Sequence, residues 1–151
     1  MCYHPLFVFN QFGDLERCVL RPGNVHSADG WREVLEPVVV RYRNKLKHRY
    51  FRGHAAFAMP DVYEFLEVEG FKYTLRLPVN SVLQERIAWM LNRLVGRPPH
   101  EVRRYHASFS YQAGSWNKPR RVVAKVEWHP DELYPRVGFI VTSLTWPLSG
   151  W

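Results

Sequence analysis

The sequence predicts an α/β fold with a β-rich C-terminal part, and a change in the spacing of apolar residues supports this prediction. Up to about residue 101, short β-prone runs alternate with stretches whose apolar residues recur every three or four positions, as in amphipathic helices. Beyond that point the period changes to two, which is typical of half-buried strands. The three runs cover residues 105–111, 122–128 and 137–141. We therefore expect an α/β body over residues 1–101, an antiparallel meander over 102–145 and a divergent tail over 146–151.

The first two β-rich runs predict an antiparallel hairpin. They cover Leu6–Gln11 and Leu15–Arg21, and a glycine-bearing loop, Phe12–Asp14, separates them. In Arg21–Asn24 a proline is followed by a glycine, which marks a turn at the end of the second strand. Further along, Phe71–Leu77 alternates apolar and polar residues and predicts another half-buried strand.

The longest helical pattern runs from Trp31 to Leu46, where apolar residues form one stripe of an amphipathic helix. Ser27 or Asp29 can cap its N-terminus, since short polar side chains accept hydrogen bonds from the first turn. Pro37 lies inside this stripe. Because proline lacks a backbone donor and crowds the preceding turn, we expect a kink or a restarted helix there.

Two shorter helices follow. The first covers residues 60–70, because a proline suits its opening turn and a glycine suits its end. The second begins at Ser81, which with Gln84 three residues later resembles a capping box. Its apolar positions continue to Leu94, after which glycine and proline end the pattern.

The composition is that of one globular domain with a basic surface. Hydrophobic residues make up 46% of the 151 positions, which is enough for a core. Lys and Arg number 21 against 14 acidic residues, so the net charge is +7, which favours contact with phosphate backbones. No apolar run approaches the ~20 residues that a membrane span needs, so we expect no membrane partner and a cytoplasmic location. Cys2 and Cys18 are expected to be reduced thiols.

One stretch places a polar side chain where ligands commonly bind. Tyr50–Gly53 is a short β-prone run, and His54 follows it directly before the next helix. In open α/β sheets, side chains at the carboxyl ends of strands face the crevice that holds ligands and metals. His54 is therefore the natural candidate for a functional residue, although a histidine at a strand end can also simply pack or bind water.

The amino-acid sequence of this stretch resembles that of bacterial insertion-sequence transposases of the DDE type. The similarity includes FRGHAAF at residues 51–57, YHPL at 3–6, LRPGN at 20–24 and GW at 30–31. The resemblance implies a ribonuclease-H-like fold in which three carboxylates bind metal and the chain cuts and joins DNA. Family members carry an aspartate, the second of these carboxylates, where this chain has His54.

The resemblance also implies that essential parts fall outside this chain. The family's first aspartate and its central first strand would precede Met1, and the catalytic glutamate would follow Trp151. We therefore expect a partial ribonuclease-H-like mixed sheet over residues 1–101, with residues 102–145 as the family's β-rich insertion. Without the central strand, either two strand edges remain unpaired or the hairpin pairs directly with Tyr50–Gly53.

These departures predict a chain that is inactive on its own. Mg²⁺, the metal of the intact family, prefers carboxylate oxygens, and imidazole is a poor replacement. We therefore expect no cofactor, no metal ligand and a non-functional His54. The remaining histidines show no metal-binding spacing.

Basic residues with aromatic neighbours predict weak, non-specific DNA binding. They lie in the β-rich insertion, at Arg103, Arg104, Lys118, Arg120 and Arg121. A solvated hairpin rim is an equally good interpretation of this pattern. Three functions stay open: a piece of a transposase from a disrupted element, a small basic module that binds DNA without chemistry, and a nuclease with a rearranged site that uses His54.

Overall fold

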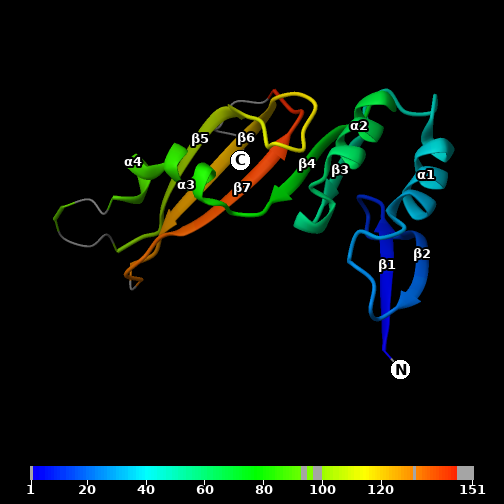
Figure 1. The fold of residues 1–151 in the computed structure, drawn as a ribbon, viewed down its shortest axis with the longest axis horizontal. Coiled ribbons are helices and arrows are strands. Elements are labelled where there is room, and N and C mark those ends of the chain that lie inside the picture. Colours follow the sequence, from blue (N-terminus) through cyan, green and yellow to red (C-terminus); the bar gives the residue numbers. More distant parts are fainter. Residues whose placement is uncertain (1, 93–94, 97–99, 131, 146–151) are drawn as a thin grey trace.

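A computed structural model describes residues 2–92, 95–96, 100–130 and 132–145, and it contains two separate sheets (Figure 1). The smaller sheet is an antiparallel hairpin of β1 (Tyr3–Phe9) and β2 (Leu15–Pro22). The larger sheet is mixed and has five strands in the order β3-β4-β7-β6-β5. The mixed α/β class predicted from the sequence is therefore found. The expected tail at 146–151 lies outside the described residues.

The five-stranded sheet joins the two halves of the chain. Its strands are β3 (Tyr50–Gly53), β4 (Lys72–Leu77), β5 (Arg103–Tyr111), β6 (Arg120–Trp128) and β7 (Arg136–Thr142). β3 and β4 run parallel, while β5, β6 and β7 form the expected antiparallel meander. The last meander strand also pairs with β4, where Leu77 lies opposite Phe139. The meander is therefore continuous with the sheet of the α/β body.

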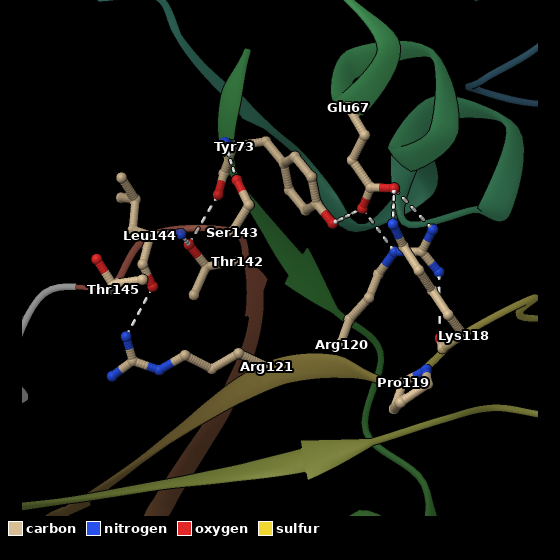
Figure 2. Close-up of a pocket in the computed structure, with 10 residues that line it drawn as sticks. All are labelled: Glu67, Tyr73, Lys118, Pro119, Arg120, Arg121, Thr142, Ser143, Leu144 and Thr145. Carbon is tan, nitrogen blue, oxygen red and sulfur yellow. Dashed lines mark hydrogen bonds and ion pairs between the residues drawn. The ribbon is translucent and has the colours of Figure 1, made fainter. Parts of the chain in front are cut away.

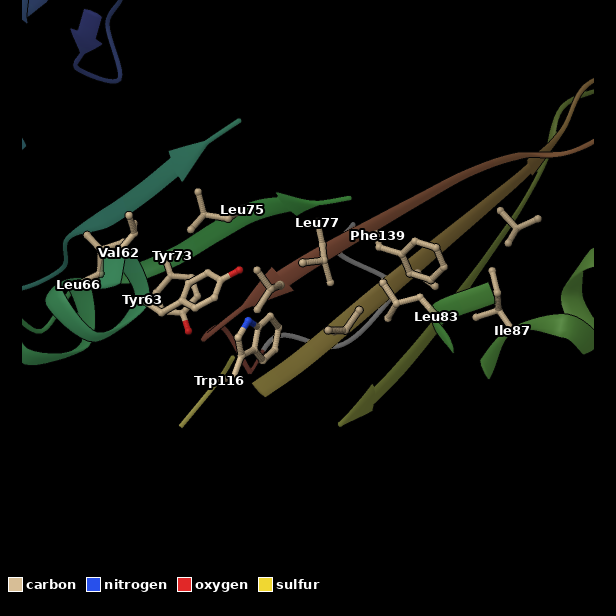
Figure 3. Packing of buried hydrophobic residues seen from close by; sticks show 14 of the residues in the cluster. Val62, Tyr63, Leu66, Tyr73, Leu75, Leu77, Leu83, Ile87, Trp116 and Phe139 are labelled. Carbon is tan, nitrogen blue, oxygen red and sulfur yellow. The ribbon is translucent and has the colours of Figure 1, made fainter. Parts of the chain in front are cut away.

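Helices cover one face of this sheet. They are α2 (Pro60–Val68), α3 (Ser81–Arg86) and α4 (Ala88–Leu91), and a short 3₁₀ turn, η1 (Ala55–Phe57), precedes them. The core lies between the helices and the strands, as Figure 3 shows for Tyr63 and Leu66 of α2, Leu75 of β4 and Phe139 of β7. All four side chains are fully buried. Burying one such side chain contributes about 1.5–3 kcal/mol to folding.

The first helix, α1 (Trp31–Tyr42), connects the hairpin to this core. Leu35 and Val39 belong to the main buried cluster, while Val34 and Val38 are buried outside it, where α1 contacts β1 and β2. One side of α1 therefore packs against the main core, its other side contacts the hairpin, and the helix connects the two.

The hairpin does not pair with the larger sheet. Among the described residues, neither β1 nor β2 shares a ladder with β3, which is the edge strand of its own sheet. Direct pairing, one of the two arrangements that the sequence left open, is therefore not found. The edges of β1 and β3 that face away from their partners carry no strand in the described part of the chain.

The expected helix caps are wrong in two places. Gly30, with a left-handed φ of 68°, precedes α1, and neither Ser27 nor Asp29 caps it. The Asp29 carboxylate instead accepts from the backbone N–H of His26 at 2.8 Å. At α3 the cap is Asn80, whose side chain accepts from the N–H of Leu83 at 2.9 Å, so the Ser81 capping box is not formed.

Helix lengths also differ from the expectation. α1 is one continuous helix through Pro37 and ends at Tyr42 rather than near Leu46, because Arg43 leaves the helical conformation with a ψ of 130°. Asn44 then adopts a left-handed φ of 64°. The helix expected from Ser81 onward is split at Ile87 into α3 and α4. Its expected end at residue 94 lies outside the described residues.

Arg21 fixes the junction between hairpin and helix. Its guanidinium donates to the carbonyls of His4 at 3.1 Å, Ser27 at 3.2 Å and His26 at 3.3 Å, and also to that of Asp29. The residue is buried, so these backbone acceptors replace the water that the charge has lost.

In the part of the chain that the structure describes, no helix has the length and apolar character of a membrane span.

Candidate nucleic-acid interface

His54 performs a local structural task. It lies at the end of β3, exposed, in an extended conformation, and acts as the N-cap of η1. Its Nδ1 accepts from the backbone N–H of Ala56 at 3.4 Å. A cap satisfies one of the backbone donors that the start of a helical turn leaves without a partner. The cap gives the imidazole of His54 a structural role that does not require a bound metal.

The described residues do not fit the magnesium site of the family. Nowhere in residues 2–92, 95–96, 100–130 and 132–145 do three His, Cys, Asp or Glu side chains gather closely enough to hold a metal ion. Asp61, near His54 in sequence, lies in the first turn of α2, where a negative charge interacts favourably with the helix dipole.

Two of the five candidate DNA-binding residues converge instead on a carboxylate of α2 (Figure 2). Arg120 donates from Nε to Glu67 Oε1 at 3.0 Å and from one terminal nitrogen to Oε2 at 3.3 Å. The Lys118 ammonium lies 2.8 Å from Oε2, and the Tyr73 hydroxyl donates to Oε1 at 2.8 Å. Glu67 thus connects α2, β4 and the start of β6.

The exposure of the two cations differs strongly. The Arg120 side chain is only 3% exposed, whereas that of Lys118 is 53% exposed. Arg120 also lies over two aromatic rings, with its guanidinium carbon 4.9 Å from the centroid of Tyr63 and 5.6 Å from that of Trp116. Such cation–π contacts add to the ion pair because the site is desolvated. Arg120 is therefore part of the core boundary rather than of the surface.

The electrostatics of this network follow from burial and hydrogen bonding together. Burial raises the pKa of Glu67, but hydrogen bonds from Arg120, Lys118 and Tyr73 outweigh it and hold that pKa below its usual value. Burial, and then the contact with Glu67, raise the pKa of Tyr73 far above its usual value. Glu67 is therefore ionised and Tyr73 is neutral at physiological pH.

A shallow pocket of about 240 Å³ lies beside this network. Glu67, Tyr73, Lys118 and Arg120 line one side of it, and the segment Thr142–Thr145 lines the other (Figure 2). Three cations, Lys118, Arg120 and Arg121, and one carboxylate, Glu67, line the pocket, so its net charge is about +2. Glu67 pairs with two of these cations, Lys118 and Arg120, and thereby lowers the charge that they offer to an anion.

Of the other three candidates, Arg121 also lines this pocket, and Arg103 and Arg104 lie elsewhere. Arg121 belongs to the opposite face of β6 from Arg120; it donates to Ser108 Oγ at 2.8 Å and to the Leu144 carbonyl at 2.7 Å. Arg103 and Arg104 lie at the far end of β5 from that site.

Arg104 Nε donates to Glu127 at 2.8 Å, whereas Arg103 points to the other side of the strand. Arg103 lies opposite Trp128 in the ladder. Tyr111, eight residues further along β5, lies opposite Arg120. Eight residues of strand span roughly 26 Å. Lys118, Arg120 and Arg121 therefore line one pocket, and Arg103 and Arg104 lie apart from it.

Cations that the sequence pattern does not single out are more exposed and less compensated. Arg52 of β3 and Lys72 and Arg76 of β4 are exposed, and none of them forms an ion pair among the described residues. A signal for them exists in the sequence, because Lys72 and Arg76 alternate with the buried Tyr73, Leu75 and Leu77. Without knowing which strands are neighbours, that signal cannot show that they share a surface with other cations.

Comparison with known families decides what kind of domain carries this surface. The family model of the transposase DDE domain, group 1, matches residues 1–150. The chain belongs to this transposase family. Neither the curated proteins nor the solved structures that were searched gave a match. The resemblance at FRGHAAF and the neighbouring motifs thus belongs to a match that extends over residues 1–150.

Proposed function

We propose that this transposase domain takes part in DNA transposition by binding DNA and that it does not cut or join DNA by itself. The family match over residues 1–150 supports the connection with transposition. The role of His54 as the cap of η1, at the place of the family's second aspartate, supports the lack of chemistry. The excess of cations, with a net charge of +7, supports contact with a polyanion.

We also propose that the fold is a ribonuclease-H-like sheet in which residues 1–101 form the core and 102–145 the β-rich insertion. In that fold the strand order is 3-2-1-4-5. β3 and β4 pair in parallel, as its fourth and fifth strands do, and β1 pairs with β2, as its second strand does with its third. The break between β1 and β3 lies where that order has its first strand.

The chain is expected to yield no nicked or joined DNA with Mg²⁺ or Mn²⁺. Two-metal phosphoryl transfer needs carboxylates that bridge both ions, whereas His54 has no carboxylate and its Nδ1 already accepts a hydrogen bond from Ala56. A supercoiled plasmid incubated with the purified chain and either metal should relax no faster than without protein. Metal-dependent nicking that is lost in His54→Ala would contradict this part of the proposal.

DNA binding is expected to be weak, independent of sequence and strongly dependent on salt. Each phosphate contact releases counterions. A plot of the logarithm of the binding constant against the logarithm of the salt concentration therefore has a slope of about −0.9 per contact. Fluorescence anisotropy with two unrelated duplexes measures this slope. The salt concentration is varied from about 50 to about 200 mM, the range over which the affinity of such proteins for DNA falls strongly. Absence of binding at the lowest salt would refute the proposed function, and a strong preference for one duplex would replace it with a specific reader.

A further inference from the structure

The face of the five-stranded sheet opposite the helices collects cations from every strand. The core face is identified by Tyr73, Leu75 and Leu77 of β4 and by their register partners on the other strands. Residues of the opposite parity belong to the second face, and cross-strand partners share it. Its exposed cations are Arg52 of β3, Lys72 and Arg76 of β4, Arg136 of β7, Lys125 of β6 and Arg104 of β5. We call these six residues the basic sheet face.

Few negative charges compensate the basic sheet face. Glu127 is the one carboxylate that the described strands place there, and it is shared by Arg104 at 2.8 Å and Lys125 at 3.2 Å. Arg136 pairs with Glu132, which lies in the loop before β7. The three cations on β3 and β4 have no ion-pair partner among the described residues. The surface therefore keeps a net positive charge, and that charge is greatest over β3 and β4.

The cations continue along the whole length of the sheet. Rows of cross-strand partners follow one another every two residues, roughly 6–7 Å apart. Lys72 lies in the first row, Arg52 in the second, Arg76 in the third, Lys125 in the fourth, and Arg136 with Arg104 in the fifth. These five rows extend over roughly 26 Å, in which duplex DNA presents about 15 phosphate charges. Figure 1 shows the strands that carry these rows, from β3 through β4 to β7, β6 and β5.

The side chains between the cations suit phosphates better than bases. Thr74, Ser108 and Ser110 of this face carry hydroxyl groups that can donate to phosphate oxygens. The aromatic rings of β5 and β6, such as Phe109 and Trp128, belong to the core face. Single-strand binding relies on stacking of bases on aromatic rings. On this face the described strands place one Tyr, Phe or Trp ring, that of Tyr50, which lies opposite Lys72 and is 57% exposed.

We propose that the basic sheet face is a docking surface for the phosphate backbone of duplex DNA. The proposal rests on the proposed function and gives it a place: DNA lies across the basic sheet face rather than at His54 or at the Glu67 network. Val123 and Thr142 in the middle of this face are buried, so the exposed cations around them make the contacts. Lys118 and Arg120, which the sequence pattern suggested, lie at the other face and are compensated by Glu67. The uncompensated cations of β3 and β4 contribute most of the contacts.

Lysine acetylation with and without a random 20-base-pair duplex tests this placement directly. The chain has five lysines, of which Lys72 and Lys125 lie on the basic sheet face and Lys45, Lys47 and Lys118 do not. DNA should slow acetylation of the first two at least several-fold, read by mass spectrometry, and leave the other three unchanged. Protection confined to Lys118, or to Lys45 and Lys47, would overturn the proposal.

A charge-matched pair of variants gives the second measurement. The sheet variant combines Arg52→Gln, Lys72→Gln and Arg76→Gln; none of these residues has an ion-pair partner to leave behind. It should weaken binding at low salt by about tenfold or more and lower the logarithmic salt slope by about 2–3, the value for three lost phosphate contacts.

The control variant changes three exposed cations elsewhere: Arg17→Gln, Lys45→Gln and Arg86→Gln, with the same loss of charge. It should weaken binding by less than about threefold, because only the general field of the protein changes. Equal losses in both variants, or none in the sheet variant, would overturn the sheet-face proposal while leaving the proposed function in place. If the unaltered chain binds no duplex at all, both proposals fail.

Discussion

Replacing Glu67 with alanine is expected to lower the free energy of unfolding by about 2–4 kcal/mol. The change leaves the Arg120 guanidinium, which is 3% exposed, without a counter-charge and removes the acceptor of the Tyr73 hydroxyl. Breaking a fully buried ion pair costs about 3–5 kcal/mol, and the expected loss is smaller here because the Glu67 side chain is 22% exposed. Urea unfolding at a protein concentration at which the chain is monomeric measures the difference.

Lys118→Ala provides the matched control, since it removes another cation from the same carboxylate. Lys118 is 53% exposed, so its ion pair contributes only about 0–1 kcal/mol. A small and equal loss in both variants would show that the network does not stabilise the junction of α2, β4 and β6.

The same network gives the domain an acid-sensitive component of stability. The pKa of Glu67 is lower in the folded chain than in the unfolded chain, so unfolding takes up a proton as the pH falls. Its contribution is complete above the unfolded pKa, near about 4–4.5, and is lost as the pH falls through the folded pKa. The unaltered chain should therefore lose more stability than Glu67→Ala does between about pH 5 and pH 3, and parallel curves would contradict the assignment.

The hairpin variant that combines Phe7→Lys with Leu20→Lys is expected to associate with itself less than the unaltered chain does. The protein concentration at which association begins should rise by about tenfold. Strand alternation places Phe7, Phe9, Leu15 and Leu20 on the hairpin face away from α1, and each is about half exposed or more. Neither β1 nor β2 has a further strand partner among the described residues. Open edges beside an exposed apolar face favour pairing with another chain.

Light scattering and sedimentation at increasing protein concentration check this expectation. The control is Val68→Lys with Val82→Lys, which adds the same charge at exposed apolar positions of α2 and α3. The control should associate nearly as the unaltered chain does. Equal improvement in both variants would mean that net charge, rather than the hairpin face, limits solubility.

The period of apolar residues is sufficient to predict most elements of this chain. Strand alternation at Lys72–Leu77 reflects which side of the backbone is buried, and this is a local property of the sequence. In Arg120–Trp128 the apolar residues alternate as well, but Val123 of the other face is also buried. The same alternation already places Arg120 on the side of Val122 and Arg121 on the other side. Their separation across the sheet could therefore have been predicted, although a basic doublet beside an aromatic residue suggests one surface cluster.

Local patterns fail where neighbouring groups compete for the same position. Asn80 rather than Ser81 caps α3, and a one-residue shift of this kind depends on which side chain reaches the N–H of Leu83. Gly30 precedes α1, while Ser27 and Asp29 make other contacts in the loop that Arg21 organises. These choices depend on contacts with the rest of the fold and not on the propensity of each residue.

The sequence by itself determined the types of the main elements, the transposase family and the histidine at the family's carboxylate position. Only the tertiary structure decided which cations share a surface. The pairing of β4 with β7 brings Thr74 next to Thr142 and thereby places Arg52, Lys72 and Arg76 on the same face as Lys125 and Arg104. Such a pairing joins residues far apart in the chain, and its register depends on the packing of both sheet faces, which no local period in the sequence contains.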